Sequence, residues 1–307
     1  MSERDPITPH DRKHVLLHGR DLAYRDLQGT GDPVLLIHGI GSSLDTWADI
    51  PDELSAQGVR VIAVDLPGHG ESSKGPGDYS LGSFACTLRD LLDHLGIDRV
   101  HLVGHSLGGG VAMQFAYQFP QRIASMLLES SGGLGEEAFT GLRAAALPGS
   151  ELAIRWAINQ RTLTAASWLG DKLGRVGITP HALSPRALET VSWLGEPDRR
   201  AAFLATLRSV VSPAGQRVSA LDKLHLMESS RVLIVWGDRD PMIPMTHGQR
   251  AHTLLEGSRF VVFPGAGHEP HLHDPDRFVA LVADHTSRSS EPASPPFAAG
   301  IGPGSAP

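Results

Sequence analysis

The residues with the clearest chemical potential are one serine followed, much later in the chain, by aspartates and histidines. Ser106 lies between Gly104 and Gly108, where the strand-like run RVHLV gives way to the helix-like run GGGVAMQFAYQF. A serine hydroxyl becomes a good nucleophile when a histidine takes its proton and a carboxylate fixes the tautomer of that histidine. The acid and base candidates follow two later strand-like runs, and they are Asp238, Asp240, His268, His271 and His273. This order, Ser then Asp then His, predicts acyl transfer through an activated serine.

The stretch GHSLG from Gly104 to Gly108 indicates a catalytic serine mainly because it lies between a strand-like and a helix-like run. The pattern G-x-S-x-G alone is weak, because a chain with 34 glycines in 307 residues matches it by chance in roughly a quarter of cases. A strand-to-helix turn, however, is the arrangement of a nucleophile elbow, in which a strained serine needs small neighbours. The helix N-terminus also directs unpaired N–H groups at the reacting centre. The alternative is a tight turn without chemistry.

The elements that must position these side chains alternate between strand and helix. The runs PVLLIHG (33–39) and VRVIAVD (59–65) are continuously apolar, which is typical of parallel strands buried on both faces. Between strands, residues 79–96 place apolar side chains at spacings of three and four and end at a glycine, as in an amphipathic helix. The pattern predicts an α/β fold with a mostly parallel central sheet flanked by helices.

The alternation breaks in the middle of the chain, which indicates an insertion. Residues 134–225 are rich in Ala, Leu and Trp and lack strand signals, so we expect a helical cap there, inserted into a core formed by residues 1–133 and 226–287. The last segment, 288–307, is rich in Pro, Ser, Gly and Ala and is predicted to be a disordered tail.

Composition excludes several other classes of protein. The formal net charge is -7, so no positive field would attract a nucleic acid. The single cysteine, Cys86, has no partner for an intrachain disulfide. The polar start MSERDPITPHDRKH lacks the apolar region of a secretory signal, and no run approaches the length of a membrane span. We therefore expect a soluble, cytoplasmic protein without an integral membrane segment; its oligomeric state is not predicted.

Four motifs together resemble the α/β-hydrolase family over roughly residues 15–285. They are HGIG (38–41), DLPGHGES (65–72), GHSLGG (104–109), and GDRDPMIP (237–244) with GAGHEP (265–270). The resemblance implies the α/β-hydrolase fold with a helical cap, a serine nucleophile at Ser106, an acid at Asp240 and a base at His268, as in esterases and lipases. It also implies an oxyanion hole formed by the backbone N–H groups of Ile40 and Leu107, without a metal or an organic cofactor.

The nearby titratable residues receive other interpretations. Asp238 is the nearest competitor of Asp240, with a structural turn as its alternative role. His271 and His273 precede a helix-like run and are expected at the surface or at the entrance to the site. His105 precedes Ser106, and the sharp turn directs consecutive side chains to different sides, so His105 is expected to have a structural role. Asp65 and His69 are expected to be structural as well.

The expected cap indicates the kind of substrate. Its many apolar residues would cover a hydrophobic pocket, which favours hydrolysis of a carboxylic ester, or a related acyl bond, of a small and largely apolar molecule. Epoxide and haloalkane hydrolases of this family carry an aspartate nucleophile where this chain has Ser106. Three alternatives stay open: carbon-carbon hydrolysis of ring-fission diketones, although HGIGSS departs from the HGxGPG turn of those enzymes; a cofactor-free perhydrolase; and a non-catalytic small-molecule binder.

Overall fold

The computed structural model describes residues 12–158, 160–174, 191–227 and 231–289. Its main sheet has eight strands in the order β1-β2-β4-β3-β5-β6-β9-β10. The strands of this sheet are β1 (Lys13–Leu17), β2 (Arg20–Leu27), β3 (Thr30–Ile37), β4 (Val59–Val64), β5 (Val100–His105), β6 (Ile123–Glu129), β9 (Val232–Gly237) and β10 (Arg259–Phe263). The helices are α1 (Ile50–Ala56), α2 (Leu81–His94), α3 (Leu107–Gln118), α4 (Thr140–Ala145), α5 (Ser150–Ala157), α6 (Gln160–Gly174), α8 (Pro197–Val210), α9 (Thr246–Leu254), α10 (Pro270–His273) and α11 (Pro275–Ser289). Short 3-10 turns are η2 (Leu44–Trp47), η3 (Pro120–Arg122) and η5 (Leu221–Leu226).

The six strands from β4 to β10 in the sheet order run parallel to their neighbours, and only β2 runs against them. The apolar runs of the sequence form these strands, because a strand covered on both faces has no solvent side for polar residues. All six residues of β5 are buried, and so are all six of β9. The predicted α/β fold with a mostly parallel sheet is therefore confirmed.

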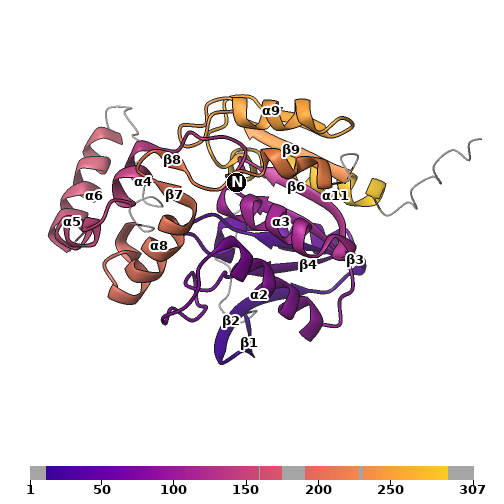
Figure 1. Cartoon of the computed structure of the whole chain (residues 1–307), viewed down its shortest axis with the longest axis horizontal. Helices are drawn as coiled ribbons and strands as arrows, with labels where there is room; N and C mark the ends of the chain where they lie inside the picture. Colours follow the sequence, from indigo (N-terminus) through magenta and orange to yellow (C-terminus); the bar gives the residue numbers. More distant parts are fainter. Residues whose placement is uncertain (1–11, 159, 175–190, 228–230, 290–307) are drawn as a thin grey trace, which may run out of the picture.

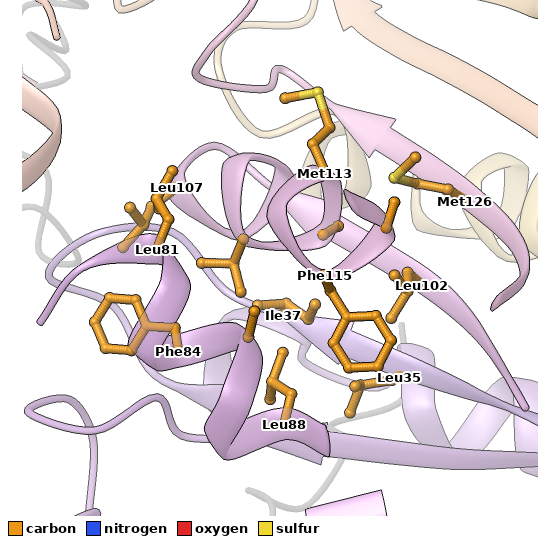
Figure 2. Packing of buried hydrophobic residues seen from close by; sticks show 14 of the residues in the cluster. Leu35, Ile37, Leu81, Phe84, Leu88, Leu102, Leu107, Met113, Phe115 and Met126 are labelled. Carbon is orange, nitrogen blue, oxygen red and sulfur yellow. The ribbon is translucent and has the colours of Figure 1, made fainter. Parts of the chain in front are cut away.

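Helices cover both faces of the sheet, and a hydrophobic core lies on each face. On one face α2, α3 and α9 pack against alternate strand residues such as Leu35 and Leu102; Figure 2 shows Phe84, Leu88 and Phe115 in this cluster. On the other face, Trp47 and helices α1 and α11 cover the intervening residues of the same strands. Because successive side chains of a strand point to opposite faces, each parallel strand contributes to both cores.

Between β6 and β9 the described chain is mainly helical, with α4, α5, α6 and α8 on one side of the sheet in Figure 1. One detail differs from the sequence-based expectation, because a short antiparallel hairpin joins β7 (Val211–Ser212) to β8 (Gly215–Gln216). Two-residue strands are too short to give an apolar alternation, and the turn Pro213-Ala214 is the only local signal. The predicted tail at 288–307 lies almost entirely outside the described residues.

Candidate active site

Ser106 occupies a sharp turn between strand β5 and helix α3. Its backbone φ is 54° and ψ is -112°, a conformation that a non-glycine residue rarely adopts. Hydrogen bonds on both sides hold it there: the Ser106 N–H donates to the Glu129 carbonyl at 3.0 Å, and the Gly132 N–H donates to the Ser106 carbonyl at 3.0 Å. The surrounding structure thus maintains a strained serine whose side chain faces a cavity.

The glycines beside Ser106 allow the turn to pack closely. A Cβ at Gly104 would lie 2.4 Å from the carbonyl oxygen of Gly108, and a Cβ at Gly108 would lie 2.0 Å from the carbonyl oxygen of Ile37. Both distances are shorter than any tolerable contact, and both involve backbone that cannot turn aside. The G-x-S-x-G spacing therefore has a steric cause in this chain.

Asp240 and His268 meet at the same edge of the sheet, in the loops after β9 and β10. The Nδ1–H of His268 donates to Oδ2 of Asp240 at 2.8 Å, while Oδ1 of Asp240 accepts the backbone N–H groups of Met242 at 2.8 Å and Ile243 at 3.0 Å. Burial of Asp240 would raise its pKa, but these hydrogen bonds and the neighbouring His268 lower the pKa below its ordinary value. Asp240 is therefore a buried carboxylate that orients the His268 ring and leaves its Nε2 available.

The competing residues are separated from this pair. The Asp238 carboxylate accepts the Gly265 N–H at 2.7 Å and so joins the turn after β9 to the turn after β10. His273 is exposed, as expected. The expectation of a surface or entrance position is wrong for His271, which is fully buried. Its ring lies against Trp47, with centroids 4.8 Å apart, because α10 places it beside the end of β6 and not at the surface.

His271 forms a buried pair with Glu129 at the end of β6. Glu129 accepts both the backbone N–H of His271 at 2.8 Å and its ring Nδ1–H at 2.9 Å, and the His271 Nε2 lies 3.2 Å from the carbonyl oxygen of Thr46. Burial would raise the pKa of Glu129, but His271 and the hydrogen bonds that it donates lower it. Glu129 belongs to none of the sequence motifs, although a carboxylate that ends an otherwise apolar strand indicates such a buried partner.

His105 links the elbow to the His268 loop. Its Nε2–H donates to the carbonyl oxygen of His268 at 2.9 Å, and the two rings lie 4.9 Å apart between centroids. Burial lowers the pKa of His105 to about 4, so the ring is neutral at pH 7. The side chain of His105 thus has a structural role, because it supports the backbone of the loop that carries His268.

The turn after β3 brings Ile40 beside the elbow. A Cβ at Gly39 would lie 3.2 Å from the Cβ of Ser106, so this turn and the serine are in direct contact. The His38 Nδ1–H donates to the Gly39 carbonyl at 2.7 Å and its Nε2 accepts the Leu66 N–H at 3.0 Å, which fixes the turn. Burial lowers the pKa of His38 to about 3, consistent with this neutral form.

Two backbone donors lie near Ser106, one in the turn after β3 and one at the start of α3. Ile40 and Leu107 both line the cavity, and within the described chain neither backbone N–H donates to a protein acceptor. Leu107 is the first residue of α3, where helix geometry leaves the N–H without an internal partner. The same region of α3 carries the positive end of the helix dipole, so the two donors can together hold a negatively charged oxygen.

Asp65 and His69 lie below the site and do not line its cavity. Asp65 is fully buried and accepts the N–H groups of Leu44 at 2.7 Å and Glu71 at 2.8 Å, although its burial raises its pKa to about 6. It fastens the loop after β4 to the loop after β3.

The cavity in front of Ser106 has a volume of about 560 Å³. Ser106, His105 and His268 lie on its wall, and the Ser106 hydroxyl and the His268 ring are not hydrogen-bonded to each other here. Most of the remaining wall is apolar and comes from the segment between β6 and β9, including Phe139, Leu142, Ile154, Leu194, Phe203 and Leu207. The volume suits a small apolar molecule.

Across the described residues, no three His, Cys, Asp or Glu side chains are grouped in a way that could hold a metal ion. Within the same ranges, none of the helices has the length and apolar character needed to cross a membrane.

Comparisons with known proteins agree with this architecture. Residues 32–275 match the family model described as alpha/beta hydrolase fold. The chain is 42% identical over 290 residues to an uncharacterized protein of Mycobacterium tuberculosis, covering 94% of this chain and 84% of the relative. It is 28% identical over 283 residues to 2-hydroxy-6-oxo-6-phenylhexa-2,4-dienoate hydrolase of Comamonas testosteroni, covering 91% and 93%. The solved structure of the esterase RhEst1 from Rhodococcus sp. ECU1013 superposes with a TM-score of 0.66 at 24% identity, covering 90% and 98%.

The chain belongs to the α/β-hydrolase family. The family match spans well over half of the chain and includes the β3 turn, the elbow and the loops with Asp240 and His268. The resemblance drawn from the four sequence motifs is thereby confirmed, and the bond that this chain cleaves is the next question.

Proposed function

We propose that this protein is a serine hydrolase that cleaves the carboxylic ester, or a related acyl bond, of a small and largely apolar substrate. The observation that carries the proposal is the pair of Asp240 and His268, hydrogen-bonded at 2.8 Å, on the wall of the cavity that Ser106 also lines. Nucleophile, base and orienting carboxylate are the three groups that activated-serine chemistry requires.

The mechanism has two halves. In the first, His268 Nε2 takes the proton of the Ser106 hydroxyl while its oxygen attacks the ester carbonyl carbon. The resulting oxyanion accepts the N–H groups of Ile40 and Leu107, and each such donor contributes about 3 kcal/mol of transition-state stabilisation. The tetrahedral intermediate then expels the alcohol, which leaves with the proton from His268, and an acyl-enzyme remains on Ser106.

In the second half, water replaces the alcohol. His268 takes a proton from the water, the hydroxide oxygen attacks the acyl carbonyl, and the carboxylic acid leaves as Ser106 regains its proton. Asp240 stays ionised throughout, because its lowered pKa keeps it a carboxylate at neutral pH. It holds the Nδ1–H tautomer of His268 and stabilises the imidazolium that forms in each half.

The segment between β6 and β9 is proposed to act as a cap that roofs the site. Its side chains supply most of the apolar wall, and α8 buries Leu204 and Leu207 against the neighbouring helices. A water-poor cavity of this kind strengthens the electrostatic contribution of the two N–H donors.

The test is a series of p-nitrophenyl esters of increasing acyl length, assayed with the wild type and with Ser106→Ala. We expect hydrolysis that prefers medium acyl chains and a fall of at least about 10⁴-fold in kcat for Ser106→Ala. Equal rates in the two folded proteins would refute the proposal.

One alternative function has its own support. The relative from Comamonas testosteroni is named as a hydrolase of 2-hydroxy-6-oxo-6-phenylhexa-2,4-dienoate, so carbon-carbon cleavage by the same residues is the second candidate. Turnover of a vinylogous diketone of this type, with no turnover of simple esters, would favour it. The perhydrolase alternative predicts peracid formation from hydrogen peroxide, and the non-catalytic binder predicts a ligand that is bound without turnover.

A further inference from the structure

The cavity continues away from Ser106 along one face of α3. Gly110, Met113, Gln114 and Tyr117 all line it, and their spacing of three and four places them in one row on that helix. In Figure 2, Met113 and Phe115 of this helix project in different directions, and only the Phe115 ring points toward Leu35. At 1.5 Å per residue, this row reaches about 12 Å from Ser106 at Gln114. The cavity therefore has an arm parallel to α3.

Polar groups gather at the far end of this arm. Lys223, in η5, lines the cavity with its ammonium 5.6 Å from the ring centroid of Tyr117, whose own pKa is raised by burial. In the described ranges, Lys223 forms no ion pair and the Gln114 amide forms no side-chain hydrogen bond. An ammonium and an amide that end an apolar channel can together bind a carboxylate.

Among the described residues that line the cavity, one carries an ammonium group and one a carboxylate, and they lie at opposite ends. Lys223 lies at the far end of the arm, whereas Glu269 directly follows His268 at the catalytic end. An anionic group on a substrate is repelled by Glu269 and attracted by Lys223, so it is directed away from Ser106 and along α3. The neutral, reacting part of the substrate then faces the elbow.

We propose that this site selects esters of medium chain length that end in a carboxylate, with Lys223 and Gln114 as the binding site for that carboxylate. The distance of about 12 Å from Ser106 to Gln114 corresponds to about ten single bonds of an extended chain. This proposal rests on the proposed ester hydrolysis, which it deepens by naming the substrate class.

The first experiment compares two matched esters, monomethyl sebacate, which carries a terminal carboxylate, and methyl decanoate, which ends in a methyl group. The quantity measured is the ratio of their kcat/KM values. We expect Lys223→Met to lower this ratio about fivefold, through a higher KM for monomethyl sebacate. A fivefold change corresponds to the contribution of one solvent-exposed ion pair to binding. Lys223→Arg should restore the ratio, because the charge returns.

The matched control is Lys172→Met, since Lys172 packs over Trp168 of α6 and does not line the cavity. It should keep the wild-type ratio. An unchanged ratio in Lys223→Met would overturn the proposal, and so would an equal fall in Lys172→Met.

The second experiment measures binding without turnover. Monomethyl sebacate is titrated calorimetrically into Ser106→Ala and into Ser106→Ala with Lys223→Met, at low and high salt. Weaker binding in the double variant, by about fivefold at low salt and less at high salt, supports the proposal even if the wild type cleaves no ester. If the wild type cleaves methyl decanoate, but Ser106→Ala and the double variant bind monomethyl sebacate equally well, the proposed ester hydrolysis stands and the proposed carboxylate site is wrong.

Discussion

The Nε2–H of His105 donates a hydrogen bond to the carbonyl oxygen of His268 at 2.9 Å, although the two residues lie 163 positions apart in the chain. This contact joins the elbow, which carries Ser106, to the loop that carries the proposed base. The relative position of Ser106 and the proposed base is thus supported by a buried, neutral imidazole.

Replacement of His105 by phenylalanine keeps an aromatic ring but removes the hydrogen bond to the His268 loop. We expect kcat to fall about fivefold, because one such bond contributes about 1 kcal/mol and about 1.4 kcal/mol is a factor of ten in rate. The pH profile should keep its shape, since the lowered pKa of His105 keeps the ring neutral in the working range. Steady-state kinetics of an ester substrate provide the measurement.

The control for that variant is His101→Phe. His101 is buried on the same strand, where its Nδ1 lies 2.8 Å from the Ser125 hydroxyl, and it does not line the cavity. Equal losses of kcat in the two variants would mean that His105 acts only through general stability.

Asp240→Asn tests which carboxylate orients the base. An asparagine amide cannot hold the Nδ1–H tautomer of His268, so kcat should fall about 10³ to 10⁴-fold. Asp238→Asn should stay within about threefold of the wild type, because among the described residues the exposed Asp238 carboxylate accepts only the Gly265 N–H. A larger kcat loss in Asp238→Asn than in Asp240→Asn would reverse the assignment.

Glu129→Gln tests the buried pair with His271 through its pH dependence. The folded-state pKa of Glu129 is lowered, so its contribution to the free energy of unfolding is present above the unfolded pKa of about 4.3 and is lost as the pH falls through the folded pKa. We expect Glu129→Gln to lower the free energy of unfolding by about 3 kcal/mol at pH 7 and by much less near pH 3. Urea unfolding at the two pH values gives the comparison.

The exposed Glu136 offers a control for this measurement, since within the described chain its carboxylate forms no ion pair. Glu136→Gln should change the free energy of unfolding by less than about 0.5 kcal/mol at either pH. A loss in Glu129→Gln that is equally large at both pH values would show that the charge of Glu129 is not what stabilises the pair.

Gly108→Ala tests the steric origin of the elbow. The new Cβ would lie 2.0 Å from the Ile37 carbonyl oxygen, so we expect a loss of at least about 3 kcal/mol in the free energy of unfolding. In Gly110→Ala the new Cβ would meet Leu81 at an ordinary 3.6 Å, and the helix gains from alanine. Urea unfolding measures the free energy of unfolding of both variants. A smaller loss in Gly108→Ala than in Gly110→Ala would contradict the steric origin of the elbow.

The sequence predicts the sheet and the elbow well because both depend on local patterns. A strand that is buried on both faces needs a continuous apolar run, and the turn at Ser106 needs Gly104 and Gly108 for contacts to nearby backbone. Order in the chain and the shared carboxyl edge of parallel strands leave two aspartates and three histidines as candidates. The choice of Asp240 and His268 among them comes from the resemblance to the α/β-hydrolase family.

Other features depend on contacts between distant segments, which one sequence does not display. The burial of His271 requires α10 to lie against Glu129 at the end of β6, and its polar sequence, PHLH, gives no sign of that. The arm of the cavity beside α3 requires η5 to lie against Tyr117. Such contacts are set by tertiary packing, so the structure was needed to find them.

The measurement that tests the central claim most directly is intact-protein mass spectrometry after exposure to a fluorophosphonate, which labels activated serines. The account predicts one adduct on the wild type, located on Ser106 by peptide mapping, absent in Ser106→Ala and formed far more slowly in His268→Ala. An adduct on another residue, or none on the folded wild type, would contradict the proposal that Ser106 is a nucleophile activated by His268.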